Sequence, residues 1–502
     1  MTISKTYSAI PIGTTANLVT VECDSTKGLP TLNIVGMANK TIEESRERIK
    51  AAIRNSGFYY PTKDKITINL APAELQKTGS FLDLAIAIAI LTHFQQFQPQ
   101  KATITLFVGE LALDGKIRPI RGILNILECA AKHNFKQVVI PAENAAQAAL
   151  FKQQKIKIIP ASTLTELWQI YAGLQSPKPL PKNVVKNTET DTNYPFLDQI
   201  IGQAQAKRAI TIAVAGHHNI LLFGPPGAGK SALASTIPNL SPKPTDDETF
   251  ELTKLHSLVS DITQPFTSRP FRAPHHSASL ASLIGRADGL PGEITLAHLG
   301  VLFLDELPEF RRDALEALRQ PLENKTITLP TTRHKIHYPA DFMLVATMNP
   351  CPCGYYGSDK HLCSCTPSAL VNYRRKLSGP LLDRIDIQIK ISSQDTPVLV
   401  KNTTFSTHEH ETAKTAIQAA MNKQFNRSNS FNSSLSSVDT MKYCKLNPSS
   451  QKLLDTASKR FDLTARSYFK ILKIARTIAD LDDSDKIAEH HLNEALQYRQ
   501  RL

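Results

Sequence analysis

Hydrophobic and polar positions along the first third of the chain follow several different spacings. They alternate at 18–23 and 65–70, which predicts half-buried strands, and 42–56 has the spacing of an amphipathic helix. Further strands are expected at 103–108 and 137–140. The pattern therefore predicts a domain that mixes strands with helices.

The rest of the chain divides at two changes of pattern. Residues 173–195 are rich in proline and then polar, which indicates a linker after a first domain of residues 1–172. We expect an α/β domain over 196–395, and the helical pattern of the C-terminal part predicts a helical domain over 396–502. Within the latter, the polar low-complexity stretch 426–437 is expected to be a flexible loop.

Residues 224–231 fit the phosphate-binding loop pattern G-x-x-x-x-G-K-[ST]. A buried strand is expected before them at 219–223, and a helix is expected to start at 231–235. Backbone N–H groups of such a loop turn toward a polyphosphate; Lys230 would reach the β- and γ-phosphates of ATP, and Ser231 would hold Mg²⁺. The alternative is a chance match in a loop of glycine and proline. The expected nucleotide-binding residues of this loop are Gly224, Pro225, Pro226, Gly227, Ala228, Gly229, Lys230 and Ser231.

A second motif supports the first. Residues 300–306 form an apolar strand that ends in Asp305 and Glu306. Asp305 is placed to bind ATP through the Mg²⁺ shell, and Glu306 to orient and activate a water molecule. Together the motifs predict an ATP hydrolase that uses Mg²⁺; the alternative is a folded but inactive nucleotide site.

Composition narrows the class of protein. The 502 residues suggest about three domains, and 58 Lys plus Arg against 45 Asp plus Glu give a net charge of +13. This charge is compatible with nucleic acid or an acidic membrane surface and does not choose between them. The apolar run 84–91 is far shorter than the roughly 20 residues that cross a bilayer, and residues 1–20 lack a secretion signal pattern. We therefore expect a cytoplasmic protein without a membrane partner.

Four segments carry a resemblance to a known family, namely 269–276, 291–294, 300–310 and 347–354. They resemble the AAA+ ATPases, and more closely the ComM/YifB family of magnesium-chelatase-like bacterial proteins. The similarity covers nearly the whole chain and implies an AAA+ P-loop core with a helical lid. It also implies a homo-hexameric ring with ATP sites between subunits. Asn349 matches the sensor that positions the attacking water; alternatively, it opens a turn.

The same resemblance implies two catalytic arginines. Arg384 resembles the arginine finger that related ring motors insert into the neighbouring subunit's ATP site, where it neutralises transition-state charge. The alternative is a structural ion pair with Asp383 or Asp386. Arg466 resembles the lid arginine that acts within its own subunit, with Arg476 as the alternative.

Two insertions in the ATPase domain resemble those that grip nucleic acid in the central pore of related motors. The first lies between the two nucleotide motifs and contains Arg269 and Arg272. The second is an expected hairpin at about 326–338, whose basic tip would contact phosphates without reading base sequence. The alternative is a solvated basic turn. The basic residues of this tip are Arg333, His334 and Lys335.

Four cysteines fall within fifteen positions directly after Asn349. Four thiolates are enough for one tetrahedral zinc ion, and a site with all four positions taken is structural rather than catalytic. The C-x-C spacing is tighter than the common C-x₂-C knuckle, so free thiols and disulfides remain as alternatives. The expected zinc ligands are Cys351, Cys353, Cys363 and Cys365.

The N-terminal domain resembles the α+β Lon-protease-type domain with its ribosomal-S5-like fold, through segments 70–83 and 109–124. In this match Phe81 stands at the position of the serine nucleophile and Leu124 at that of the lysine base. Since a peptidase needs both groups, we expect a module for ring assembly or DNA contact instead. Its basic residues form either a DNA-binding surface or ordinary solvated charges: Lys77, Lys116, Arg118 and Arg121.

The leading hypothesis is a hexameric, ATP-driven DNA motor, meaning a helicase or branch-migration translocase. The family resemblance implies action on single-stranded and branched DNA during natural transformation, together with recombination proteins. Two alternatives are a magnesium-chelatase-like motor for metal insertion and a protein remodeller or Lon-like protease. The basic hairpin tip favours a phosphate backbone over a protein substrate.

Overall fold

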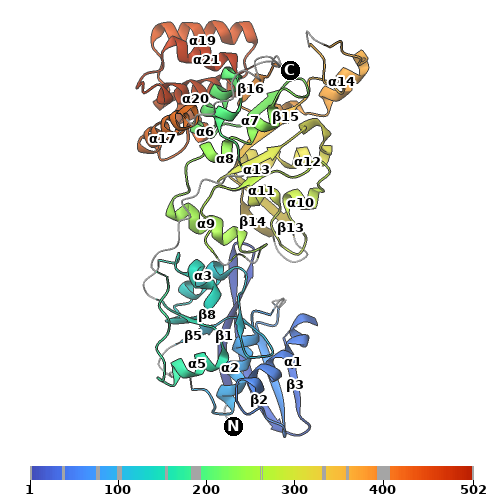
Figure 1. Ribbon diagram of the computed structural model, residues 1–502, viewed down its shortest axis with the longest axis vertical. Helices are drawn as coiled ribbons and strands as arrows, with labels where there is room; N and C mark the ends of the chain where they lie inside the picture. Colours follow the sequence, from blue (N-terminus) through green and yellow to red (C-terminus); the bar gives the residue numbers. More distant parts are fainter. Residues whose placement is uncertain are drawn as a thin grey trace.

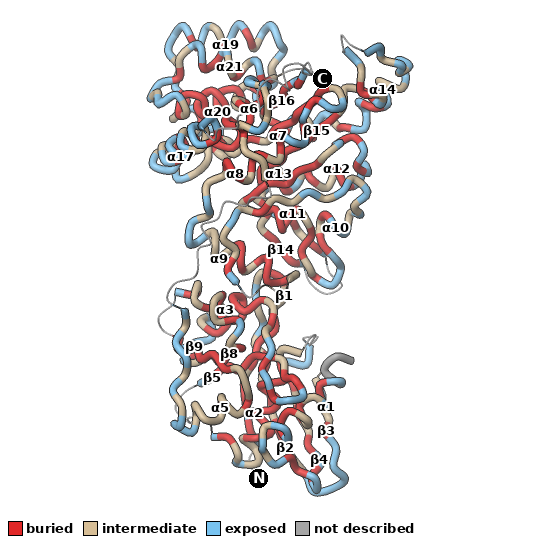
Figure 2. The backbone as a smooth tube through the Cα atoms, viewed as in Figure 1, coloured by how far each residue is buried: buried red, intermediate tan, exposed pale blue. Residues whose placement is uncertain are grey.

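The structure is a computed structural model that describes residues 3–36, 40–74, 80–98, 104–152, 156–181, 194–260, 262, 264–330, 335–357, 361–392 and 408–499. The molecule is elongated, with the N-terminal elements at one end and the C-terminal helices at the other (Figure 1). Both parts have buried interiors (Figure 2). The mixed α/β class expected from the sequence is confirmed.

Seven strands of the described N-terminal residues form one mixed sheet in the order β3-β4-β2-β1-β5-β8-β9. The expected strands and the expected amphipathic helix α1 are all present. Helix α2 is apolar on every side and is correspondingly buried along its length. The strands are β1 (Ser4–Ile12), β2 (Thr15–Lys27), β3 (Thr31–Val35), β4 (Asp64–Ala71), β5 (Thr105–Phe107), β6 (Glu110–Leu111), β7 (Ile117–Arg118), β8 (Gln137–Pro141) and β9 (Lys157–Ala161). The helices are α1 (Lys40–Asn55), α2 (Asp83–His93), α3 (Ile123–Lys132), α4 (Ala145–Ala148) and α5 (Leu164–Tyr171).

The central part contains a parallel sheet in the order β11-β12-β15-β10-β16. Its inner strands are almost continuously hydrophobic because both faces of the sheet are covered. The strands are β10 (Ile220–Phe223), β11 (Phe271–Arg272), β12 (Val301–Leu304), β13 (Thr326–Pro330), β14 (Lys335–Pro339), β15 (Met343–Met348) and β16 (Ile387–Lys390). The helices are α6 (Ala204–Gly216), α7 (Lys230–Ala234), α8 (Ile237–Leu240), α9 (Asp246–His256), α10 (Leu280–Ile284), α11 (Glu293–Leu296), α12 (Arg312–Ala317), α13 (Arg319–Asn324), α14 (Pro367–Arg375) and α15 (Gly379–Leu382).

The C-terminal helices share one hydrophobic core with the parallel sheet, and two of them, α17 and α20, pack on α6. They are α17 (His408–Ser428), α18 (Ser437–Tyr443), α19 (Pro448–Phe461), α20 (Ala465–Leu481) and α21 (Glu489–Gln497).

The expectation of a flexible loop at 426–437 is wrong. Helix α17 continues to Ser428, and the Asn432 side chain is fully buried, donating hydrogen bonds to Thr477 (3.1 Å) and Asp480 (2.9 Å) of α20. The polar side chains of this stretch therefore have partners inside the fold that a count of residue types does not reveal.

The N-terminal part meets the central part at the tip of the β1–β2 hairpin. A Cβ atom added at Gly13 would lie 2.4 Å from Ile336 Cγ2 on β14, so only glycine allows this close approach. An ion pair between Lys254 of α9 and Glu128 of α3 joins the two parts as well. Among the described residues, no helix combines the length and hydrophobicity needed to cross a membrane.

Candidate functional site

The phosphate loop lies at the carboxyl end of the central strand β10. Gly227 (φ 74°) and Gly229 (φ 84°) both adopt left-handed backbone conformations, which turn the loop before α7 begins at Lys230. At Gly224 a side chain has no room, because a Cβ atom would lie 2.1 Å from the carbonyl oxygen of Ile391. Gly224 therefore allows the loop to pack closely on Ile391, and Gly227 and Gly229 allow the turns that wrap a loop around phosphates.

The Lys230 ammonium folds back over this loop. Its Nζ donates hydrogen bonds to the carbonyl oxygens of Gly224 (2.9 Å) and Pro225 (2.8 Å) and to Asn349 Oδ1 (3.0 Å). Burial lowers the pKa of Lys230, while the nearby carboxylates of Asp305 and Glu306 act in the opposite direction. A bound polyphosphate would provide the ammonium with stronger, charged acceptors in place of these neutral ones.

Asp305 and Ser231 meet as the sequence predicted for a magnesium site. Ser231 Oγ lies 3.1 and 3.0 Å from the two Asp305 carboxylate oxygens, and both side chains are at least partly exposed. Hydroxyl and carboxylate oxygens are the ligands that Mg²⁺ prefers. The pair therefore fits a magnesium ion bound beside the phosphate loop.

Thr347 ties the acidic pair to the neighbouring strand. Its Oγ1 donates a hydrogen bond to Asp305 and accepts one from the Glu306 backbone N–H (3.0 Å). Glu306 adopts a left-handed backbone conformation (φ 55°) just after the strand ends, and its side chain is exposed. Thr347 was not predicted as a site residue. The one feature of the sequence that could have indicated it is a hydroxyl group within an otherwise hydrophobic, buried strand.

Asn349 lies where a sensor of the terminal phosphate would be expected. It follows β15, the neighbour of β10, and its side chain contacts Lys230 directly. In this position its amide faces the phosphate loop rather than only opening a turn.

Arg384 lies at the opposite edge of the sheet from the phosphate loop. It precedes β16, and its carbonyl accepts a hydrogen bond from Asn219 (2.9 Å), the residue before β10. Both strands run parallel for four residues, so this edge is about 13 Å from the phosphate loop at about 3.3 Å per residue. The guanidinium, buried to 8% exposure, donates to Glu323 and to the Pro380 carbonyl. Neither Asp383 nor Asp386, the ion-pair alternatives, is its partner in these contacts.

Arg466, expected to act within its own subunit, lines the same cavity as Arg384 and Glu323, and Lys230 does not line it. Its Nη1 lies 4.0 Å from Glu323 Oε1, so it shares this carboxylate with Arg384. The alternative, Arg476, is buried and donates to the carbonyls of Ser484 and Asp485. Arg476 is therefore a brace within the helical part.

The two arginines of the first insertion are partly buried and bind other residues of the same chain. Arg269 donates from Nη2 to both carboxylate oxygens of Glu248, and from Nε and Nη1 to the carbonyls of Pro242 and Leu299. Arg272 forms a bidentate pair with Glu293 through Nε (2.6 Å) and Nη2 (2.8 Å). This geometry favours structural braces over DNA contacts, contrary to the sequence-based expectation, because the donors already have charged or carbonyl acceptors.

The second insertion is a hairpin, as expected. Strands β13 and β14 pair antiparallel from Thr326↔Pro339 to Pro330↔Lys335, and Lys335 is exposed at the end of the described stem. Arg333 and His334 lie outside the described residues. The stem packs on the first insertion, where the Tyr338 hydroxyl donates to the Gly289 carbonyl (2.5 Å).

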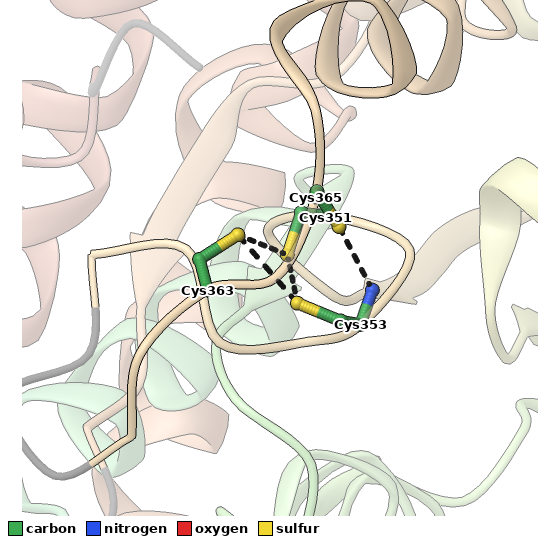
Figure 3. Close-up of side chains that lie close together, drawn as sticks. All are labelled: Cys351, Cys353, Cys363 and Cys365. Atoms are coloured by element: carbon green, nitrogen blue, oxygen red, sulfur yellow. Dashed lines mark hydrogen bonds between the residues drawn. The ribbon is translucent and has the colours of Figure 1, made fainter.

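The four cysteines converge after β15 (Figure 3). Their sulfur atoms all lie within 4.8 Å of one another, and three of the separations are 3.3, 3.5 and 3.7 Å. A tetrahedral zinc ion with Zn–S bonds of about 2.3 Å requires separations of about 3.8 Å. Two backbone N–H groups also point at these sulfurs, from Tyr356 to Cys351 (3.3 Å) and from Cys353 to Cys365 (3.4 Å).

The N-terminal domain has neither member of the expected peptidase pair at the matching positions. Phe81 is half-buried, and Leu124 is fully buried in the core around α3. Ser80 is hydrogen-bonded to Glu110, and Arg118 and Lys116 form ion pairs with Glu110 and Asp114. Lys77 lies outside the described residues.

Replacing Thr347 by Val tests its contacts, because valine has nearly the same shape and lacks the hydroxyl. Hydrogen bonds to charged groups are worth about 1.5–3 kcal/mol, so we expect ATP turnover to fall about ten-fold or more with a small change in thermal stability. Steady-state kinetics over a Mg²⁺ titration measure this. The matched control is Thr295→Val, since Thr295 is buried and its hydroxyl has no partner among the described residues. Unchanged turnover in Thr347→Val would exclude the role.

Comparison with known proteins identifies relatives of the whole chain. Three family models match: "Magnesium chelatase, subunit ChlI" over residues 196–399, "Subunit ChlI of Mg-chelatase" over 21–144, and the C-terminal model of the same subunit over 408–499. Shorter matches, each covering 33% of the chain, are to the Lon protease of Trichlorobacter lovleyi (25% identical) and the ClpX subunit of Treponema denticola (26% identical).

Two full-length relatives are more similar. The protein YifB of Escherichia coli is 41% identical over 99% of this chain and 97% of its own length. The competence protein ComM of Haemophilus influenzae is 40% identical over 99% of this chain and 98% of its own. The chain therefore belongs to the ComM/YifB family of magnesium-chelatase-like AAA+ ATPases.

Proposed function

We propose that this protein is an ATP-dependent DNA motor that works as a homo-hexamer in natural transformation and recombination. The observation that supports a ring is the position of Arg384 and Arg466 at the opposite edge of the sheet from Lys230. Arginines so placed serve ATP only when a second copy brings its phosphate loop to them. A closed ring of identical subunits supplies this arrangement at every interface.

In this proposal the ATP site has parts from two subunits. One subunit binds the phosphates through its loop and Lys230, and Ser231 with Asp305 would hold a magnesium ion, which neutralises phosphate charge. Glu306 accepts a proton from the attacking water, and Asn349 positions that water. Arg384 and Arg466 of the neighbour stabilise the charge that develops; such arginine fingers are worth about 10³–10⁵ in rate.

The β13–β14 hairpin is the proposed contact with DNA. Lys335 at its exposed end, together with Arg333 and His334, would bind backbone phosphates in the pore. The net charge of +13 suits a polyanionic partner. The relative named competence protein ComM supports a role connected with competence. For such a role we propose single-stranded or branched DNA as the substrate, recombination proteins as partners and the cytoplasm as the site of action.

A metal-insertion motor is the second candidate. It is favoured by the match of three chelatase-subunit models, which together span the N-terminal, central and C-terminal parts. The two candidates share the ATP chemistry and differ in the effector: DNA stimulates the first, and a separate porphyrin-binding protein is needed by the second.

We also propose that the four cysteines hold one structural zinc ion. The convergence of the sulfurs and the N–H···S contacts supports this over free thiols. Zinc would order a loop that has little core of its own; binding is worth about 10–16 kcal/mol in small finger peptides.

The DNA motor is tested by ATP hydrolysis with and without single-stranded and forked DNA, together with strand displacement. We expect DNA to stimulate turnover and ATP to drive displacement. Glu306→Gln is expected to bind ATP without hydrolysing it, and Lys230→Ala to lose binding. If DNA does not change ATP turnover and no strand is displaced, the chelatase-like candidate is favoured.

Mixed rings test the shared site. Arg384→Ala and Lys230→Ala subunits are each expected to be inactive alone. A mixture contains interfaces where an intact Lys230 meets an intact Arg384, so partial ATPase activity should return. The measurement is turnover against mixing ratio, with Lys230→Ala plus Glu306→Gln subunits as a control that forms no interface with both an intact phosphate loop and an intact Glu306. Absence of rescue at every ratio would contradict a role for Arg384 across the interface.

Metal analysis tests the zinc site. We expect about one zinc per chain, lost in Cys363→Ser, because a tetrahedral site needs all four thiolates. Cys129→Ser is the control, since Cys129 is a buried free cysteine in the N-terminal part. Protein purified without added metal that carries no zinc would favour plain thiols.

A further inference from the structure

Glu323 joins the arginine edge of the ATPase to the stem of the hairpin. A cavity of about 520 Å³ lies at this edge, and its walls include both arginines and both ends of the hairpin. The lining residues used below are Glu323, Lys325, Asp341, Arg384, Arg466 and Ser434. This one space therefore lies between the two arginines and the base of the hairpin.

The Glu323 carboxylate is shared by the two arginines. One oxygen accepts a hydrogen bond from Arg384 Nη2, and the other lies 4.0 Å from Arg466 Nη1. Hydrogen bonding from Arg384 lowers the pKa of Glu323, so the carboxylate is ionised at neutral pH. Arg384 Nε is buried without a partner among the described residues, so this guanidinium has donor capacity left.

Glu323 also lies three residues before the first strand of the hairpin. It lies at the end of α13 (Arg319–Asn324), and β13 begins at Thr326 after a left-handed turn at Lys325 (φ 55°). Lys325 Nζ binds Asp341, which follows β14, at 2.8 Å, and Ser434 at 2.6 Å. The two ends of the hairpin are thus fastened together, and a movement of Glu323 would be transmitted to the whole stem.

We propose that Glu323 is a positioning residue. Its carboxylate and the terminal phosphate of ATP on the neighbouring subunit bind the same two arginines in turn. Carboxylate and phosphate are competing acceptors for the same guanidinium fork. When the neighbour holds ATP, the arginines turn to its phosphate and release Glu323, which frees the hairpin stem. After hydrolysis and phosphate loss the carboxylate recaptures them. The inference rests on the proposed function, because it requires the arginines to act across the interface.

The test is Glu323→Gln in the full-length ring, with ATP turnover, DNA stimulation and strands displaced per ATP measured together. Without the competing charge the arginines are free, so we expect DNA-independent turnover to rise. Coupling between two sites is typically about 5-fold or more, so the DNA stimulation ratio and displacement per ATP should fall by about that factor. Glu323→Asp keeps the charge and should restore part of the coupling.

The matched control is Glu316→Gln. Glu316 lies on the preceding helix α12, is ion-paired with Arg319, and does not line the cavity. It should leave the DNA stimulation ratio unchanged.

Two results would overturn the proposal. One is a Glu323→Gln ring with normal DNA stimulation and normal displacement per ATP. The other is a fall in turnover and displacement in equal proportion together with a lower melting temperature, which indicates a structural brace. Arg384→Ala in the same assays distinguishes a failure of the Glu323 proposal from a failure of the proposed function. If ATP turnover is unchanged in Arg384→Ala, the ATP site is not shared between subunits, and the proposed function itself is contradicted.

Discussion

The common direction of the strands in the parallel sheet is the constraint on which the rest of the structure depends. Parallel strands place all their carboxyl ends at one edge, where the phosphate loop, Asp305 and Asn349 gather. Arg384 precedes its strand and therefore lies at the other edge, with a strand length between it and Lys230. No movement of a side chain closes that distance. In the proposed function, Arg384 therefore reaches the phosphates of ATP only when a second copy of the chain brings its phosphate loop to this edge.

The parts of the site that could be predicted from the sequence are those whose structure is determined by residues close together along the chain. The phosphate loop is a local turn fixed by glycines before a helix, and Asp305 with Glu306 ends a hydrophobic strand. Thr347 and Glu323 were missed because their roles depend on which strands and helices become neighbours. The strand order β12-β15-β10 brings Thr347 to Asp305 across 42 positions of sequence.

The acceptors of the arginines could not be predicted from the sequence either. Arg269 and Arg272 belong to a basic segment that resembles a DNA-binding insertion, yet each has a glutamate partner 21 positions away. A charge count contains no information about such partners. Arg466 belongs to a motif whose role was assigned by analogy within one subunit, but the packing of α20 places it beside Arg384. Residue type and motif thus identified basic groups without determining which acceptor each one faces.

The cysteine loop is not part of the sheet, yet it contacts the phosphate loop at the carboxyl edge. Cys351 follows Asn349 by two residues, and a Cβ atom at Gly354 would lie 2.6 Å from Pro226 Cδ of the phosphate loop. The loop therefore packs closely on the nucleotide cradle. Most of its described residues are at least partly exposed, and its four cysteine sulfur atoms lie within 4.8 Å of one another. If a metal orders that cluster, it also limits how far Asn349 and the phosphate loop can separate. The cysteine loop would then hold the carboxyl edge, while at the amino edge the Glu323 carboxylate binds Arg384.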